Sequence, residues 1–134
     1  MSEQSAEKFI EALGKLEKSE DVETIVALFA DDAEIGNVTL TESLSGTDGA
    51  KEFWTNYRKT FGEVSSEFTN KIHSENVSAL EWTSTGTSAN GSEISYDGVS
   101  ILEFDDAEKI KRFFAYFNPA KLGSQIEEAK ANAG

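Results

Sequence analysis

Residues 77–117, VSALEWTSTGTSANGSEISYDGVSILEFDDAEKIKRFFAYF, decide the fold of this chain. Apolar and polar side chains alternate through most of the stretch, as they do in half-buried β-strands. Two turn sequences interrupt the alternation, the dipeptide Asn90-Gly91 and the run DDAE at 105–108. Asn-Gly is the dipeptide that tight hairpins prefer, because both positions tolerate positive φ. The stretch therefore predicts three consecutive antiparallel strands.

A fourth strand is predicted ahead of these three. Every second residue from Val64 to Ile72 alternates with a polar neighbour, and the run SEN at 74–76 is typical of a turn. Phe68 and Ile72 share the inward parity of this strand. His73 is therefore expected on its outer face.

Three helices are predicted before the strands. Their apolar faces consist, in order, of Phe9, Leu13 and Leu16; Val22, Ile25, Val26 and Phe29; and Ala50, Phe53, Trp54, Tyr57 and Phe61. Ser19 is the expected N-cap of the second helix, and Gly62 the expected end of the third. At the other end of the chain, Asn118-Pro119 predicts the start of a weakly amphipathic, frayed helix from about residue 119.

Helices followed by a meander of long strands predict an α+β domain, with the helices packed on one face of a strongly curved, mainly antiparallel sheet. Such a sheet leaves a pocket between its concave face and the helices. The length of the chain and its lack of linkers or repeats predict one domain over residues 1–134.

Composition excludes several classes of function. The chain has 25 acidic and 12 basic residues and a formal charge of −13, which argues against binding nucleic acid or anionic lipid. It has no cysteine and one histidine, so thiolate and multi-histidine metal sites are excluded, and no metal or cofactor is expected. No apolar run has membrane-spanning length and the N-terminus is polar, so a cytoplasmic location is expected.

Three stretches carry a resemblance to a known family: SEDVETIVALFADDAEI at 19–35, LSGTDGAKEFW at 44–54 and GVSILEFDDAEKIKRFFAYF at 98–117. They resemble the nuclear transport factor 2-like superfamily, and within it the SnoaL-like and ketosteroid isomerase-like branch. The resemblance spans residues 9–118. It implies a cone-shaped fold whose open end admits a small, mostly hydrophobic molecule. This superfamily includes isomerases, cyclases, dehydratases, hydrolases and noncatalytic binders, so the fold alone does not give the activity.

The positions that carry out catalysis in ketosteroid isomerases differ in this chain. By the resemblance, Asn37 stands where those enzymes have an aspartate base, Leu13 where they have a tyrosine donor, and Ser100 where they have a protonated aspartate. An amide cannot remove a proton and a leucine cannot donate a hydrogen bond. Ketosteroid isomerase activity is therefore not expected.

The acids of ADDAEIGN, residues 30–37, are expected at the surface. Asp31 and Asp32 are interpreted as turn residues between a helix and a strand, and Glu34 as an outward residue of that strand. Asn37 is either a ligand-orienting group in the cavity or a structural hydrogen-bonding residue. Asp97 is expected on the outer face of its strand.

The SnoaL-like cyclases use an aspartate and a histidine in the pocket. In this chain the last strand ends in Asn118, where that branch often has an aspartate. With His73 and Asp97 both expected to face outward, no carboxylate is placed in the cavity.

The candidate ligand-binding residues combine apolar side chains with a few polar groups. They are Leu13, Asn37, Trp54, Trp82, Ser84, Ser100, Phe113 and Phe117. The apolar members could equally fill a solid core. Two functions follow: a protein that binds a small hydrophobic molecule, or a SnoaL-like enzyme of cyclase, isomerase or dehydratase type acting on a small polycyclic or hydrophobic substrate.

A homodimer is also expected, because proteins of this superfamily often associate through the outer face of the sheet. Short polar side chains suited to such packing are Ser78, Glu81, Thr83 and Thr85, all expected on that outer face.

Overall fold

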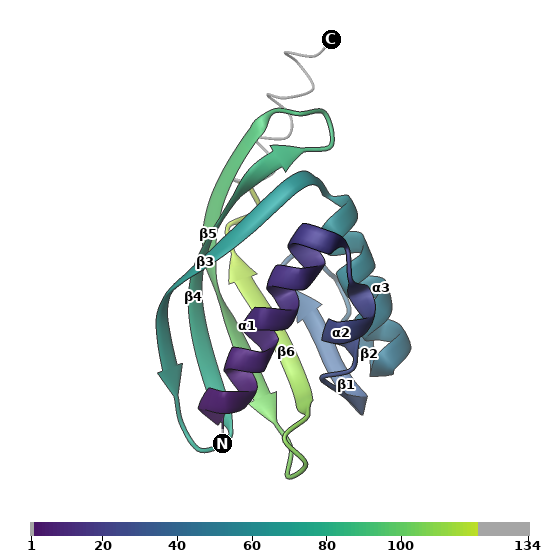
Figure 1. Ribbon diagram of the computed structural model, residues 1–134. Helices are drawn as coiled ribbons and strands as arrows, with labels where there is room; N and C mark the ends of the chain where they lie inside the picture. Colours follow the sequence, from purple (N-terminus) through teal and green to yellow (C-terminus); the bar gives the residue numbers. More distant parts are fainter. Residues whose placement is uncertain (1, 121–134) are drawn as a thin grey trace.

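The computed structural model describes residues 2–120, which form three helices packed on a six-stranded sheet (Figure 1). The helices are α1 (Ser2–Ser19), α2 (Val22–Val26) and α3 (Gly46–Lys59). The strands are β1 (Phe29–Asn37), β2 (Leu44–Ser45), β3 (Phe61–His73), β4 (Val77–Ser88), β5 (Glu93–Phe104) and β6 (Ile110–Phe117). They lie in the order β2-β1-β6-β5-β4-β3, where β1 and β6 are parallel and the other described neighbours antiparallel. The predicted α+β fold, with N-terminal helices on a curved, mainly antiparallel sheet, is confirmed.

The three strands predicted from residues 77–117 are β4, β5 and β6, and both predicted turns join them. Between β4 and β5, Gly91 has a φ of 88° and its N–H donates to the carbonyl oxygen of Ser88 at 2.9 Å. Asn90 does not adopt positive φ, so this is a longer turn over residues 89–92 and not the two-residue turn that Asn-Gly favours.

The turn between β5 and β6 is organised by one aspartate. Asp105 Oδ1 accepts hydrogen bonds from the backbone N–H groups of Ala107 and Lys109, both at 2.9 Å. Glu108 has a φ of 64°, which reverses the chain. A short acidic side chain that bonds to the backbone ahead of it is a common way to fix a turn.

The second helix begins later than predicted. Ser19 is the last residue of α1, and Glu20 leaves the helix with a φ of 58°. Asp21 is the N-cap of α2, because its side chain accepts a hydrogen bond from the backbone N–H of Thr24 at 3.2 Å. Phe29, predicted for this helix, is the first residue of β1.

The third helix ends earlier than predicted. It stops at Lys59, and Phe61 and Gly62 open β3. The Arg58 guanidinium holds this junction by donating to the carbonyl oxygens of Phe61 and Gly62, at 3.0 and 3.2 Å. Gly62 does not end the helix but lies in a closely packed part of β3, where a Cβ would be 2.7 Å from Thr87 Oγ1.

The stretch ADDAEIGN lies entirely within β1. Pairing with β6 is irregular between Phe29 and Glu34, so that Asp31 and Asp32 are both exposed while Ala33 and Ile35 are fully buried. The predicted surface position of these acids is confirmed, although they belong to an irregular strand and not to a helix end. Glu34 faces outward as predicted.

A bulge in β3 reverses two predicted orientations. Compared with β4, β3 has one extra residue between Phe68 and Asn70. Ile72 is therefore 60% exposed, and His73 lies on the helix side of the sheet, where its Nδ1 is 2.7 Å from Ser78 Oγ. The predicted outward position of Ser78 is wrong. Ser78 has the same parity as the inward residues of β4 and is fully buried.

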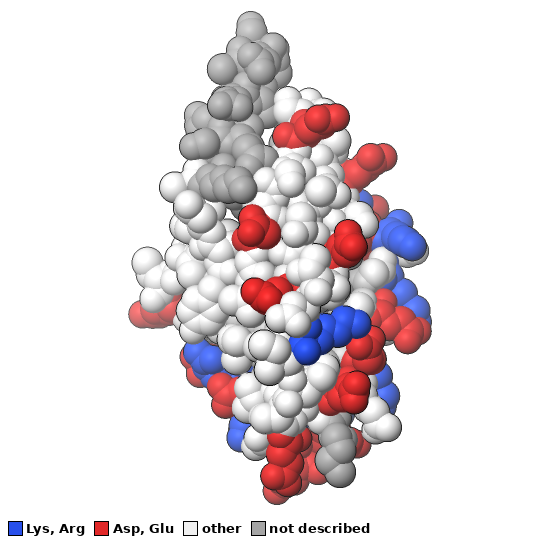
Figure 2. Space-filling model, turned by 90° about the vertical axis from the view of Figure 1, so that its left-hand side faces the viewer, with Lys and Arg blue, Asp and Glu red and all other residues white. Residues whose placement is uncertain are grey.

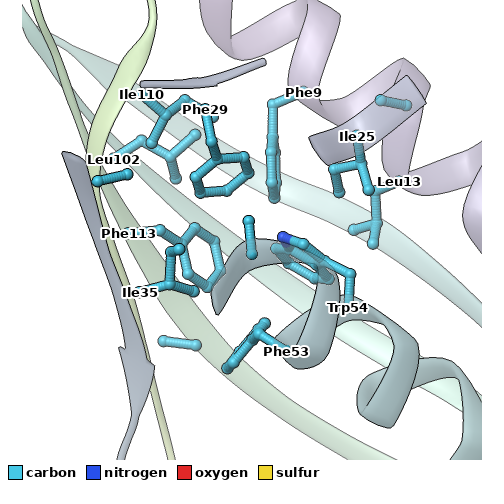
Figure 3. Packing of buried hydrophobic residues seen from close by; sticks show 14 of the residues in the cluster. Phe9, Leu13, Ile25, Phe29, Ile35, Phe53, Trp54, Leu102, Ile110 and Phe113 are labelled. Atoms are coloured by element: carbon cyan, nitrogen blue, oxygen red, sulfur yellow. The ribbon is translucent and has the colours of Figure 1, made fainter. Parts of the chain in front are cut away.

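The main core lies between the helices and the sheet (Figure 3). Phe9 of α1, Trp54 of α3 and Phe113 of β6 meet at its centre, with ring centroids 5.1–5.8 Å apart. A second buried cluster consists of Phe61, Val64, Trp82, Ile94 and Tyr96. The half-buried rings of Tyr57, Phe68 and Phe117 contact both clusters.

In Figure 2 the middle of the face is mostly uncharged, with a few single acids, and charged side chains of both signs gather along its right-hand and lower edges. Within residues 2–120, no helix has both the length and the apolar character needed to cross a membrane. Asn118 Oδ1 accepts from the N–H of Ala120 at 3.0 Å, as expected of an N-cap. The rest of the predicted C-terminal helix lies outside the described residues.

Candidate functional site

A cavity of about 50 Å³ lies between the two buried clusters, bounded by α1, α3 and the helix side of the sheet. Its wall is mainly aromatic. The volume has room for a few water molecules and is well below the roughly 300–1,000 Å³ of pockets that enclose drug-sized ligands. In this form the cavity suits a compact molecule and not a polycyclic one.

Seven of the eight candidate residues are brought together around this cavity. They are Leu13, Trp54, Trp82, Ser84, Ser100, Phe113 and Phe117. Their inward placement follows from two periodicities, the helical stripes of α1 and α3 and the alternation along β4, β5 and the second half of β6. Whether they bind a ligand stays a prediction.

Asn37 does not line the cavity. It is the last residue of β1, and its Oδ1 accepts hydrogen bonds from the N–H and the hydroxyl of Thr39, at 2.9 and 2.6 Å. These bonds form a local turn at the strand end. Of the two interpretations of Asn37, the structural one therefore applies.

Trp82 and Ser100 form a polar contact in the cavity wall. The indole N–H of Trp82 donates to Ser100 Oγ at 2.9 Å. Gly98, which lies opposite Trp82 on β5, makes room for the ring, because a Cβ there would lie 2.8 Å from it. Ser100 Oγ is the acceptor in this bond, so its own hydroxyl hydrogen is not used there.

The indole N–H of Trp54 has no hydrogen-bond partner among the described residues, although its side chain is almost completely buried. Figure 3 shows this ring surrounded by apolar side chains, including Phe9 and Phe113. A buried donor without a partner costs about 1–3 kcal/mol. Trp54 lines the cavity, and its buried N–H is a donor without a described partner.

A buried carboxylate beside the cavity was missed by the sequence interpretation. Glu17 of α1 is 6% exposed. Its oxygens accept from the hydroxyl of Tyr57 at 2.8 Å, the hydroxyl of Ser66 at 2.6 Å and the backbone N–H of Ser66 at 3.1 Å. The hydroxyl oxygens of Ser66 and Ser84 are 2.6 Å apart, so the network reaches the cavity wall at Ser84.

The sequence did contain a signal for this placement. Glu17 is four residues after Leu13 and follows Leu16, so the helical period puts it on the buried stripe of α1. A charged residue in an apolar stripe is unusual and indicates a partner or a function.

Burial and the Glu17 charge raise the pKa values of two tyrosines in the cavity wall. Burial raises the pKa of Tyr57 well above its ordinary value, and the negative charge of Glu17 raises it further. The pKa of Tyr96 is raised by the same two causes in the same order. Both hydroxyl groups therefore stay neutral at physiological pH.

The other candidate acid–base residues lie away from the cavity. Asp31 and Asp32 border an open, partly acidic hollow of about 780 Å³ at the start of β1, larger than the cavity but at the surface. His73 bonds Ser78 and does not line the cavity. Asp97 is exposed on the outer face of the sheet, as predicted. Residues 2–120 contain no group of three or more histidine and acidic side chains arranged to hold a metal ion.

Comparison with known proteins places this fold in a family. The profile of the SnoaL-like domain matches residues 6–113. Among curated proteins, no sequence matches the chain.

Several solved structures have the same fold. A nuclear transport factor 2-like protein of unknown function from Burkholderia pseudomallei is 18% identical, with 93% of this chain and 96% of that one covered and a TM-score of 0.81. A protein with a ketosteroid isomerase-like fold from Catenulispora acidiphila, in complex with trimethylamine, is 13% identical, with 88% and 91% covered and a TM-score of 0.75. An LEH-like epoxide hydrolase of M. tuberculosis is 16% identical, with 96% and 93% covered and a TM-score of 0.72. At these identities the likeness is one of fold. Because the profile spans most of the chain, the protein belongs to the SnoaL-like domain family.

Proposed function

We propose that this protein binds a compact, largely apolar molecule in the cavity between its helices and its sheet, without ketosteroid isomerase chemistry. The observation that carries the proposal is the mainly aromatic cavity at the centre of the domain, with the hydroxyls of Ser84 and Ser100 in its wall. Small-molecule sites combine apolar walls with a few polar groups in this way. The trimethylamine complex of the C. acidiphila protein supports a ligand of small size for this fold.

The position of Asn37 supports the absence of isomerase chemistry. The reaction requires a base beside the substrate, and the Asn37 side chain is instead used in the turn with Thr39. We expect the purified protein to convert a Δ5-3-ketosteroid no faster than buffer does. Turnover well above that background would show that another group supplies the base.

An enzymatic function of the SnoaL-like type is the second candidate, and Glu17 is the observation that favours it. It is a buried carboxylate beside the cavity, and the M. tuberculosis relative of similar fold is described as an epoxide hydrolase. A catalytic base must reach the proton that it removes. Both oxygens of Glu17 are already bonded to Tyr57 and Ser66, and this arrangement favours binding over catalysis.

The binding proposal can be tested with 3,3-dimethylbutan-1-ol, a compact and mostly apolar alcohol. Titration should change the fluorescence of Trp82 and Trp54 in a saturable way, since both indoles line the cavity. Ala115→Leu should weaken binding at least tenfold, because Ala115 also lines the cavity and the larger side chain fills it. The matched control is Ala79→Leu, which adds the same atoms on the outward parity of β4 and should leave binding unchanged.

The free energy of unfolding of Ala115→Leu shows whether the leucine fills a cavity or overpacks a solid core. Overpacking costs roughly 1–3 kcal/mol, whereas a leucine that enters existing space costs less. Unchanged alcohol binding by Ala115→Leu, or no saturable binding by the parent protein, would count against the cavity as the binding site.

A further inference from the structure

The carboxylate of Glu17 is buried without a cationic partner among residues 2–120. The ion pairs of the described residues join Lys15, Lys51, Lys71 and Arg112 to other acids, and none includes Glu17. Its three hydrogen bonds come from neutral groups of Tyr57 and Ser66. Buried charges in proteins are normally paired. The negative charge beside the cavity is therefore not balanced by a described side chain.

Three aromatic rings that line the cavity stand at steep angles to one another. The rings of Trp82 and Tyr96 are 5.2 Å apart at 81°, those of Tyr96 and Phe117 are 5.5 Å apart at 70°, and those of Trp82 and Phe117 are 6.3 Å apart at 55°. All three line the cavity. The face of an aromatic ring carries partial negative charge, and sets of inclined rings are the arrangement that recognises quaternary ammonium groups.

We propose that the cavity selects a compact organic cation, a methylated ammonium group, which the rings of Trp82, Tyr96 and Phe117 contact and whose charge Glu17 balances. This inference rests on the proposed binding function and specifies the class of ligand. A methylated ammonium is apolar on its surface and needs no hydrogen-bond acceptor. Glu17 can therefore act through its charge, although its oxygens are already bonded to Tyr57 and Ser66.

The charge of Glu17 also acts on the two tyrosines of the cavity wall. Glu17 helps to raise the pKa values of both Tyr57 and Tyr96, after the larger contribution of burial. A charge that disfavours a phenolate at these positions favours a cation at the same place. The formal charge of −13 for the whole chain would also draw cations toward the protein at low salt.

The test compares two probes of the same shape that differ in charge. Choline has a quaternary nitrogen where 3,3-dimethylbutan-1-ol has a quaternary carbon. Titrations of the full chain, followed by calorimetry and tryptophan fluorescence, should show choline binding at least about tenfold more tightly, which is the combined effect of the Glu17 charge and of the ring faces on a desolvated cation. Glu17→Gln should reduce this preference to about twofold or less, because it removes the charge and keeps most of the side-chain shape.

The control variant is Glu11→Gln, which changes the net charge equally on the exposed side of the same helix. It should keep the preference for choline. Should Glu17→Gln not fold, Phe117→Leu gives a second test: it removes a ring, keeps apolar volume, and should weaken choline binding more than alcohol binding.

The outcomes are distinguishable. Equal affinity for both probes would overturn the cationic ligand and leave the binding proposal standing. No saturable binding of either probe would overturn both. Equal loss of the preference in Glu17→Gln and Glu11→Gln would assign it to net charge, and this would also overturn the role of Glu17.

Discussion

Tyr57→Phe tests the hydrogen-bond network around Glu17 with the smallest available change. The substitution removes one oxygen atom and keeps the ring, which packs against Trp54 and Phe61 with centroids 5.6 and 5.5 Å away. No apolar cavity is created. Glu17 keeps its two bonds from Ser66 and loses the one from Tyr57.

The expected cost follows from the charge of the acceptor. A hydrogen bond to a charged group contributes about 1.5–3 kcal/mol, so we expect the free energy of unfolding to fall by about 2 kcal/mol. This corresponds to a roughly 30-fold smaller folding constant. Urea unfolding followed by circular dichroism measures it, with a lower midpoint and an unchanged slope against denaturant.

The matched control is Tyr116→Phe. Tyr116 is 44% exposed on β6, and the same deletion there should change the free energy of unfolding by less than about 0.5 kcal/mol. If Tyr57→Phe is as stable as this control, the bond to Glu17 contributes nothing and the reasoning about a buried charge beside the cavity is wrong.

Three further predictions concern pH, the sheet and assembly. The pKa values of Tyr57 and Tyr96 are raised in the folded protein, so the fold favours the neutral form of both hydroxyls. This preference leaves stability unchanged below the unfolded pKa of about 10 and lowers the free energy of unfolding as the pH rises above it. The urea midpoint should therefore fall from pH 10 to 11, and less steeply for Tyr57→Phe. Gly98→Ala should lower the unfolding midpoint and disturb Trp82 fluorescence, since the new Cβ would lie 2.4 Å from the carbonyl oxygen of Tyr116; native stability and fluorescence would contradict this. We expect a homodimer through the outer sheet face, where Ile72 and Tyr116 are exposed, and raised salt should favour it by screening the net charge; sedimentation at micromolar concentration showing monomer alone would contradict it.

The sequence predicted the sheet well because alternating apolar and polar side chains indicate directly which face of each strand is buried. β4 and β5 keep one parity throughout, so Trp82, Ser84 and Ser100 were placed on the cavity side from spacing alone. The bulge in β3 breaks this rule. One additional residue after Phe68 reverses the face of the sheet on which every later side chain of β3 lies. No residue type at that point indicates a bulge.

Helix ends and the polar part of the site were harder to predict, for separate reasons. Serine and aspartate are both good N-cap residues, so residue type does not distinguish Ser19 from Asp21. The positive φ of Glu20 ends α1 and makes Asp21 the N-cap of α2. Glu17 was missed because acids on helices are usually solvated, and its three donors come from α3 and β3, far away in the sequence. Asn37 was expected to face the cavity because of the position that it matches in ketosteroid isomerases. In this chain its side chain instead accepts a hydrogen bond from Thr39, two residues later.

The pairing of β1 with β6 has a consequence for synthesis on the ribosome. The partners Phe29 and Ile110, or Asn37 and Ala115, are roughly 80 positions apart, and β2 supplies only a short partner on the other edge of β1. A nascent chain that has emerged as far as β5 therefore has its helices and the meander of β3, β4 and β5, but β1 still lacks β6, its long partner strand. The six-stranded sheet forms when β6 enters between β1 and β5, so the last of the described strands to leave the ribosome is the one that joins β1 to the meander of β3, β4 and β5.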